Sequence, residues 1–288
     1  MGSQASMNKT EPTMTHRTAL VNGQEAAAGP LMAIGGAEDK MDDKVILSSF
    51  AHFAGGKDAR IAVVPTASSI EDAGNRYKAL FLGMGVESAE VVYIGNREDA
   101  NAESQVETLD DATGIFLTGG NQVRLSVLIG GTRFEETVRR KHREGTVIAG
   151  TSAGASILSA HMIAGGAGGA VPKQRMAQMV AGFGLISNVI IDQHFRQRNR
   201  IGRLLALVAT NPGLLGIGVD EDTAAVFDSD GRMNVIGRHS VTIVDGSEMY
   251  SDIFRVKGHG EVTVSNARLH VLPAGRGFDL RERTMIED

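Results

Sequence analysis

The chain has 288 residues, of which 42% are hydrophobic and 22% are charged, and its formal net charge is −5 at pH 7. These values are typical of a globular protein with a buried core, and they give no electrostatic footprint for nucleic acid. The absence of cysteine excludes disulfides, cysteine-ligated metals and a catalytic thiol. Any covalent nucleophile is therefore expected to be an oxygen or a lysine, and we expect neither a cofactor nor a metal.

The ends of the chain and its apolar runs bear on location. No apolar run approaches the ~20 residues that a membrane span requires. Residues 1–28 are polar and rich in small residues, without the hydrophobic core of a signal peptide. We expect residues 1–28 to be a flexible leader and residues 29–288 to form one α/β domain, located in the cytoplasm and not bound to a membrane.

From residue 30 onward, short apolar strands alternate with helices. The predicted elements are, in order, a strand at Leu31–Ile34, a helix at Val45–Phe53, a strand at Ile61–Val64, a helix through Tyr77–Leu80, strands at Val91–Ile94 and Gly114–Leu117, helices over about Val123–Arg143 and a strand at Thr146–Ala149. Strands without polar alternation, separated by helices, predict a mostly parallel sheet covered on both faces. In such sheets the ligand site lies at the carboxyl ends of the strands.

After Pro212 the pattern changes, because strand candidates follow one another without helices between them. They are Leu214–Val219, Thr223–Phe227, Met233–Ile236, Val241–Val244 and Val262–Val264. We expect them to form an antiparallel edge that completes the one sheet. The Gly-Ala run at Ala164–Ala170 predicts a mobile loop.

A nucleophile elbow is predicted directly after the strand at Thr146–Ala149. Gly150-Thr151-Ser152-Ala153-Gly154 has the Gly-x-Ser-x-Gly pattern of a tight strand-to-helix turn that exposes a serine hydroxyl. The backbone N–H of Ala153 can then point at an oxyanion, and that of Gly120, in the turn after another strand, is a second candidate donor. The pattern by itself also fits a purely structural turn.

A serine nucleophile needs a base and an acid that orients it. His194 follows the apolar run Val189-Ile190-Ile191 and is predicted at the same edge as Ser152, although a strand-end histidine bonded to the backbone is the simpler alternative. The candidates for the acid are the three consecutive carboxylates Asp220, Glu221 and Asp222. Strand alternation places Glu221 on the face opposite Asp220 and Asp222, and sequence does not decide which face meets His194.

Four arginines lie close together after His194, at the start of an apolar helix. Cations at this end of a helix oppose its macrodipole, so the cluster favours an anionic ligand or buried carboxylate partners over a helix-stabilising role. A basic surface patch is the alternative. The residues are Arg196, Arg198, Arg200 and Arg203.

Taken together, these motifs resemble the cyanophycinases, members of the serine peptidase family that also contains dipeptidase E. The resemblance covers most of the chain from about residue 30. The matching segments are Thr118-Gly119-Gly120-Asn121-Gln122, Gly150 to Ala155, Asp192-Gln193-His194-Phe195 with the following arginines, and Gly218 to Ala224. The resemblance implies a three-layer, mostly parallel α/β fold of the class I glutamine-amidotransferase type, usually a homodimer. It also implies a triad of Ser152, His194 and Glu221.

The family's substrate is cyanophycin, a polyaspartate whose side-chain carboxylates carry arginine. The resemblance implies cleavage of its backbone to β-Asp-Arg dipeptides. Arg and Gln side chains suit its carboxyl groups, and a carboxylate suits its guanidinium groups. The candidate substrate ligands are Gln122, Gln193, Arg198, Arg200 and Arg203 for the carboxyls and Asp192 for the guanidinium.

Three other functions stay open at this point. A dipeptidase E-like or isoaspartyl peptidase would use the same triad, although the arginine cluster favours the polymer-degrading enzyme. An esterase on an α/β-hydrolase fold would place the acid before the histidine in the chain, contrary to the order here. A non-catalytic binding protein would leave Ser152 as an inert turn residue.

Overall fold

The computed structural model describes residues 27–287. Its framework is a nine-stranded sheet in the order β17-β16-β11-β10-β1-β5-β4-β2-β3. One half is parallel: β1 (Leu31–Ile34), β5 (Val147–Thr151), β4 (Gly114–Leu117), β2 (Arg60–Val64) and β3 (Ser88–Val91). The other half is antiparallel: β10 (Thr223–Phe227), β11 (Arg232–Gly237), β16 (Gly277–Asp279) and β17 (Thr284–Ile286). The predicted leader lies almost wholly outside the described residues.

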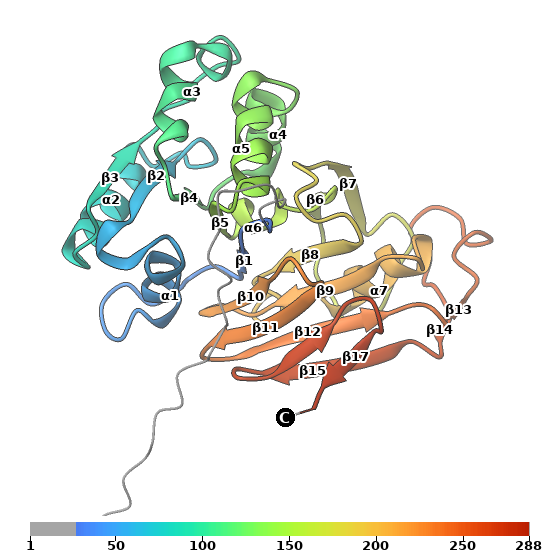
Figure 1. Cartoon of the computed structure of the whole chain (residues 1–288). Coiled ribbons are helices and arrows are strands. Elements are labelled where there is room, and N and C mark those ends of the chain that lie inside the picture. The colour runs from blue at the N-terminus through green and yellow to red at the C-terminus, as the bar shows by residue number, and fades with distance from the viewer. Residues whose placement is uncertain (1–26, 288) are drawn as a thin grey trace, which may run out of the picture.

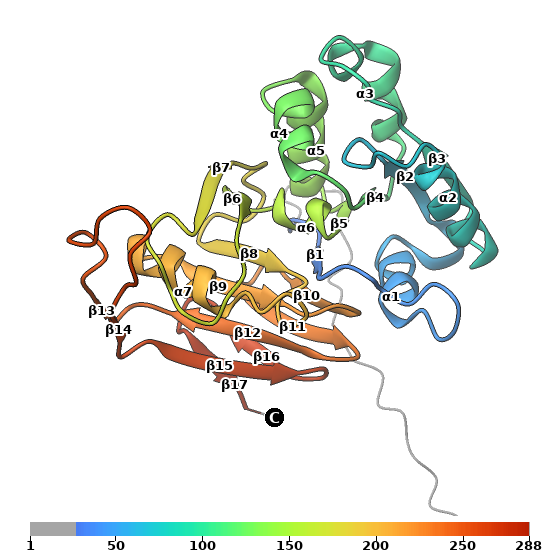
Figure 2. The ribbon, with the colours of Figure 1, turned by 180° about the vertical axis from the view of Figure 1, so that it is seen from behind.

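Helices cover both faces of the parallel half (Figures 1 and 2). Met32 and Ile34 of β1 join the core beneath α1 (Val45–Phe53) and α2 (Ala73–Gly83). Leu31 and Ala33 face the core on the opposite side of the sheet. Both faces are buried, which explains why these strands are apolar throughout. The opposite face carries α3 (Glu103–Asp110), α4 (Gln122–Ile129), α5 (Arg133–Arg143) and the short α6 (Ala153–Ser156).

A second, four-stranded sheet in the order β15-β12-β9-β8 lies against the antiparallel half of the first. The core side chains Ile217 and Ile243 pack with Ala225 and Val235 of the first sheet. The helix α7 (Ile201–Thr210) covers the outer face of the second sheet (Figure 1). The strands are β8 (Val189–Gln193), β9 (Leu215–Val219), β12 (Ser240–Asp245) and β15 (Arg268–Pro273).

The α/β class with antiparallel C-terminal strands is therefore confirmed, but the expectation that those strands complete a single sheet is wrong. β9 and β12 belong to the second sheet, while β10 and β11 extend the first. Because the chain alternates between the two sheets, their inward faces share one core. β9 and β10, which follow one another in sequence, thus lie in different sheets and pack face to face instead of pairing edge to edge, and β11 and β12 likewise lie in different sheets.

Two small hairpins and two short helical turns complete the described chain. β6 (His161–Gly166) pairs with β7 (Ala177–Ala181), so the predicted loop at Ala164–Ala170 begins inside a strand. β3 ends at Val91, where the strand predicted at Val91–Ile94 was expected to begin. The second hairpin is formed by β13 (Tyr250–Ser251) and β14 (Val264–Ser265). The turns are η1 (Gly56–Asp58) and η2 (Asp99–Asn101). Within residues 27–287, no helix has the length and apolar character needed to cross a membrane.

Candidate active site

The predicted elbow lies between β5 and α6, and its serine has an unusual backbone conformation. Ser152 has φ 53° and ψ −109°, a combination that L residues rarely adopt. The flanking glycines permit the tight turn: a Cβ on Gly150 would lie 2.0 Å from the carbonyl oxygen of Gly154, and one on Gly154 would lie 2.3 Å from that of Leu117. The small residues of the motif are therefore required by close backbone approach.

His194 follows β8 directly and reaches the serine from the second sheet. Its backbone N–H donates to the carbonyl oxygen of Gly35 at 2.8 Å, which ties the end of β8 to the end of β1. A Cβ on Gly36 would lie 2.3 Å from the imidazole Cε1, so only glycine leaves room for the ring. In this position His194 Nε2 lies 2.9 Å from Ser152 Oγ.

Glu221 completes a hydrogen-bonded series, since its Oε1 lies 2.7 Å from His194 Nδ1. A carboxylate only accepts, so Nδ1 carries the proton of the neutral ring and Nε2 is left as the acceptor. The Ser152 hydroxyl then donates to Nε2. The three residues that the sequence singled out are therefore brought together in the geometry that a serine nucleophile requires.

The two aspartates beside Glu221 point elsewhere. Asp220 is buried, and its carboxylate accepts from the backbone N–H of Arg196 at 3.0 Å and from the Ser240 hydroxyl at 3.3 Å. Asp222 Oδ1 accepts from the backbone N–H of Asp39 at 2.8 Å. β9 ends at Val219, so a turn, and not strand alternation, directs Glu221 toward His194.

The environment of His194 lowers the pKa of its imidazole below the ordinary value. Burial contributes most, and the nearby Arg198 cation acts in the same direction, while the hydrogen bond to Glu221 opposes both. A lowered pKa keeps the ring neutral, and hence able to accept a proton, at lower pH than an unperturbed histidine.

The Gly119-Gly120 turn after β4 lies against the serine. A Cβ on Gly119 would lie 3.3 Å from Ser152 Cβ, and Gly120 has φ 143°, beside the carbonyl oxygen of Ala67. Ala153 follows Ser152 as the first residue of α6. The two predicted oxyanion donors, the N–H groups of Gly120 and Ala153, thus belong to segments that border the hydroxyl.

Most of the predicted substrate ligands are engaged within the protein. Asp192 is fully buried and accepts from Arg203 Nε at 2.7 Å and again from Arg203 Nη2, while Arg200 Nη1 lies 3.4 Å away. Arg200 also donates to the carbonyl and side-chain oxygens of Gln193. Gln122 donates through Nε2 to two backbone carbonyls of β6, each at 3.0 Å. Burial raises the pKa of Asp192, against the opposing effect of Arg203.

Arg198 differs from Arg200 and Arg203, the two arginines of the cluster that follow it in the chain. Its side chain is exposed, and it is close enough to His194 to affect the imidazole pKa. Arg196 is paired with Asp220, at 3.5 Å between Nε and Oδ2. Arg198 is therefore the predicted ligand whose side chain is exposed beside His194.

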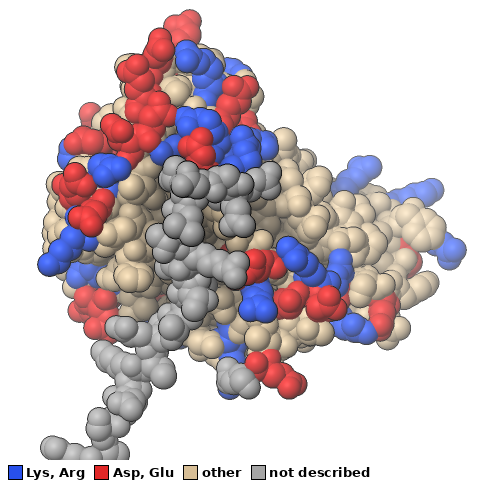
Figure 3. Space-filling model, in the orientation of Figure 1, with Lys and Arg blue, Asp and Glu red and all other residues tan. Residues whose placement is uncertain are grey.

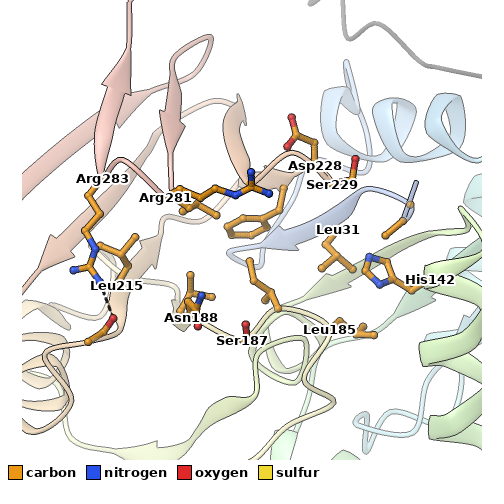
Figure 4. Close-up of a pocket in the computed structure, with 18 residues that line it drawn as sticks. Leu31, His142, Leu185, Ser187, Asn188, Leu215, Asp228, Ser229, Arg281 and Arg283 are labelled. Carbon is orange, nitrogen blue, oxygen red and sulfur yellow. Dashed lines mark hydrogen bonds between the residues drawn. The ribbon is translucent and has the colours of Figure 1, made fainter. Parts of the chain in front are cut away.

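A cavity of about 560 Å³ lies at the amino ends of β1 and β9, at the opposite end of these strands from Ser152 and His194 (Figure 4). It is lined by Leu31 and Leu215 at the starts of β1 and β9 and by His142, Arg281 and Arg283, and no triad residue borders it. On the face shown in Figure 3, acidic and basic side chains are interspersed. Among residues 27–287, no cluster of three or more His, Asp or Glu side chains is arranged to hold a metal ion.

Comparison with known proteins identifies the family. The model of peptidase family S51 matches residues 31–235. The chain belongs to peptidase family S51. It is 42% identical over 281 residues to a cyanophycinase of Nostoc sp., covering 96% of this chain and 94% of that one. It is 43% identical over 252 residues to a cyanophycinase of Geminocystis herdmanii, covering 86% and 93%.

A solved structure shares the fold of this S51 chain. The crystal structure of a peptidase from an acI-B1 Actinobacterium superimposes with a TM-score of 0.66 at 24% identity, covering 89% of this chain and 98% of that one. This likeness confirms the predicted fold class. The family match and the curated relatives confirm the predicted resemblance to the cyanophycinases and the predicted peptidase class.

Sequence reasoning missed the part of this S51 site that follows β1. Gly36 makes room for the His194 ring, Gly35 makes room for the backbone carbonyl of Asp220, and the buried Glu38 accepts from the Thr151 hydroxyl at the end of β5. A Gly-Gly pair directly after an apolar strand, at the edge where the serine was predicted, was the available signal. The sequence around Glu38 has no pattern that predicts its burial.

Proposed function

We propose that this chain is a serine-type exopeptidase that hydrolyses cyanophycin, multi-L-arginyl-poly-L-aspartate, to β-Asp-Arg dipeptides. The observation that carries the proposal is the series of hydrogen bonds from Ser152 Oγ to His194 and from His194 to Glu221, at 2.9 and 2.7 Å. The cyanophycinases at 42–43% identity support the choice of substrate.

The proposed reaction has two halves. In acylation, Ser152 Oγ attacks a backbone carbonyl of the polymer while its proton passes to His194 Nε2. The C–N bond then breaks, and the leaving amine takes that proton from the imidazolium. In deacylation, a water gives a proton to Nε2 and attacks the acyl-enzyme, and the proton returns to Ser152 Oγ. Glu221 stabilises the imidazolium in both halves without taking its proton.

Backbone donors stabilise the oxyanion of each tetrahedral intermediate in this proposal. The N–H groups of Ala153 and Gly120 lie on the two segments that border Ser152, and Ala153 heads the helix α6. Donors fixed by the backbone need no reorganisation as charge develops, which makes them effective in a half-buried site.

For substrate recognition, we assign Arg198 to a carboxylate of the polymer. It is exposed, and its guanidinium is free to form the two parallel hydrogen bonds that a carboxylate favours. Asp192, Gln193, Arg200 and Arg203 instead hold the segment that carries Arg198, since their side chains bond to one another. The charge of Arg200 and Arg203 still contributes a positive field behind the site.

Digestion of insoluble cyanophycin tests the proposal most simply. Products are identified by mass, with Ser152→Ala as the inactive form and the exposed Ser48→Ala as the matched control. Release of β-Asp-Arg by the wild type and by Ser48→Ala, and none by Ser152→Ala, is expected. Intact polymer with the wild type, or cleavage only of small aspartyl dipeptides, would overturn the substrate assignment.

A homodimer and a cytoplasmic location are further proposals, supported by the resemblance to a family whose members are usually dimeric. Sedimentation equilibrium of the full chain tests the first, and cell fractionation tests the second. A monomer at micromolar concentration would contradict the dimer.

A further inference from the structure

The segment that follows β1 contacts every part of the chain that carries a member of the triad. Four backbone groups between Ile34 and Asp39 are engaged in this way. Ile34 O accepts from Ser152 N at 2.9 Å, Gly35 O from His194 N at 2.8 Å and Gly36 O from Asp222 N at 2.9 Å, and Asp39 N donates to Asp222 Oδ1 at 2.8 Å. One short segment thus sets the relative positions of two sheets at the site.

Glu38 lies in the middle of this segment, with only 3% of its surface exposed. Its Oε2 accepts from the Thr151 hydroxyl at 2.6 Å. Its Oε1 accepts from the Tyr77 hydroxyl and lies 2.9 Å from Lys40 Nζ. Thr151 is the residue immediately before the nucleophile, so the carboxylate is attached to the elbow itself.

Burying the Glu38 carboxylate costs desolvation free energy, so stability alone does not explain its use at the end of β5. An apolar pair of similar size would avoid the desolvation cost. Burial and the neighbouring Glu38 both raise the pKa of the Tyr77 phenol, so the phenol stays protonated at neutral pH and can donate to Glu38. All three partners of Glu38 therefore remain donors, and the carboxylate stays fixed between them.

We propose that Glu38 is a positioning residue for the nucleophile: through Thr151 it holds Ser152 in the conformation that aims Oγ at His194. This inference rests on the proposed role of Ser152. The conformation at φ 53° is strained, and such a residue persists only where its surroundings determine it from several sides. Gly154 and Ile34 constrain the backbone after and beside the serine. Glu38 supplies the constraint before it.

Loss of this constraint would let Thr151 and Ser152 relax together, with no change at His194, Glu221 or Arg198. The hydroxyl would then spend less time within reach of Nε2, and the chemical step would slow while substrate binding stayed the same. A misplacement of about 1 Å at a reacting group can cost roughly a hundredfold in rate.

Three substitutions in the full-length protein separate positioning from stability. Thr151→Val keeps the shape of the side chain and removes its hydroxyl, Thr151→Ser keeps the hydroxyl, and Glu38→Gln removes the charge. The matched control is Thr146→Val, a buried threonine just before the other end of β5. The rate constant for covalent modification of Ser152 by a fluorophosphonate, followed by intact mass, is measured for each, together with kcat, KM and Tm.

Thr151→Val and Glu38→Gln are expected to lower the modification rate and kcat by roughly ten- to a hundredfold, with KM within about twofold of wild type. Thr151→Ser is expected to restore both rates, and Thr146→Val to lower only Tm. Wild-type modification rates in folded Thr151→Val and Glu38→Gln would overturn the inference.

The same data separate this inference from the proposed function. If the wild type is modified at Ser152 but releases no β-Asp-Arg, the substrate assignment fails, and the modification rates still decide the role of Glu38. If the wild type is not modified at all, the nucleophile and its positioning residue are both wrong.

Discussion

At the scale of single residues, two adjacent carboxylates at the end of β9 have different partners. Glu221 contacts only the imidazole among the triad groups, whereas Asp220 bonds to the backbone of Arg196 and to Ser240. In the proposed mechanism the first therefore bears on chemistry, whereas the second holds the loop that follows His194.

Glu221→Gln is expected to lower kcat by ~10²–10⁴, because the imidazolium formed during acylation loses its charge partner. Asp220→Asn keeps one acceptor oxygen and is expected to lower Tm while leaving kcat within about tenfold of wild type. Steady-state assays on cyanophycin with thermal unfolding of both variants check this. The opposite ranking in kcat would mean that Asp220 orients the base.

The pH dependence follows from the lowered pKa of His194. The base must be neutral, so kcat/KM should fall on the acid side, with a midpoint below the ordinary histidine value of 6.5. Removing the cation in Arg198→Ala favours the imidazolium, so this midpoint should move to higher pH.

Arg196→Ala is the control for that shift, because the Arg196 guanidinium pairs with Asp220. The acid-side midpoint of kcat/KM for Arg196→Ala should equal that of the wild type. Arg198→Ala should also raise KM for cyanophycin by roughly tenfold or more, since a charge-assisted hydrogen bond is worth ~1.5–3 kcal/mol, and should leave KM for a simple activated ester unchanged. Equal losses on both substrates would contradict the assignment of Arg198.

At the scale of elements, the arginines at the start of α7 are explained by a partner on β8. Asp192 lies fully inside the protein, and Arg203 and Arg200 neutralise it. The unfavourable position of these cations relative to the helix macrodipole is offset by that buried ion pair. The pair fixes α7 to the strand that ends in His194.

Arg203→Ala is expected to lower the free energy of unfolding by about 3–5 kcal/mol, because it leaves the Asp192 carboxylate buried without its main partner. Urea denaturation measures this. The matched control is Arg198→Ala, an exposed arginine of the same segment, whose unfolding free energy should stay within ~0.5 kcal/mol of wild type. Equal, small effects in the two variants would show that the ion pair is not needed for stability.

The order of elements could be predicted largely from sequence, and their pairing could not. β1, β4, α1 and β10 lie where apolar periodicity placed them, because each buries a face that the pattern reveals. The pattern of β9 is the same whether it pairs with β10 or packs across from it. Which arrangement forms depends on contacts between distant segments, such as those between Ile217 and Ala225.

The site, like the fold, could be predicted where it depends on local patterns and not where it depends on contacts between distant segments. Ser152 and His194 could be singled out because each follows an apolar strand whose carboxyl end is legible in the sequence, whereas Glu221 was chosen over Asp220 only through the resemblance to the cyanophycinases. The engagement of Asp192 with Arg203 was left open as one of two explanations for the arginines. Glu38 was missed, since its burial arises from Tyr77 and Thr151, which are distant in the chain.

At the scale of the whole molecule, the proposed triad is divided between two sheets. Ser152 follows a strand of the large sheet, and His194 and Glu221 follow strands of the small one. The two sheets share one hydrophobic core, in which Ile217 packs with Ala225 and Phe278. Neither sheet carries a complete site.

A single cooperative unfolding transition is therefore expected, in which activity and tertiary structure are lost together. Urea titration followed in parallel by near-ultraviolet circular dichroism and by residual hydrolysis checks this, with far-ultraviolet circular dichroism as the third probe. Coincident midpoints support one folding unit over residues 29–288. Loss of activity at a clearly lower urea concentration than loss of tertiary signal would show that the sheets separate first.

The central claim, that Ser152 and His194 act as one catalytic unit on cyanophycin, is tested most directly by comparing Ser152→Ala, His194→Ala and the double variant. Members of such a unit are non-additive, and loss of one typically costs ~10⁴–10⁶ in rate. We predict that kcat for cyanophycin falls by this amount in each single variant and no further in the double variant. More than a few per cent of wild-type activity in pure, folded Ser152→Ala, or additive losses in the double variant, would contradict the account.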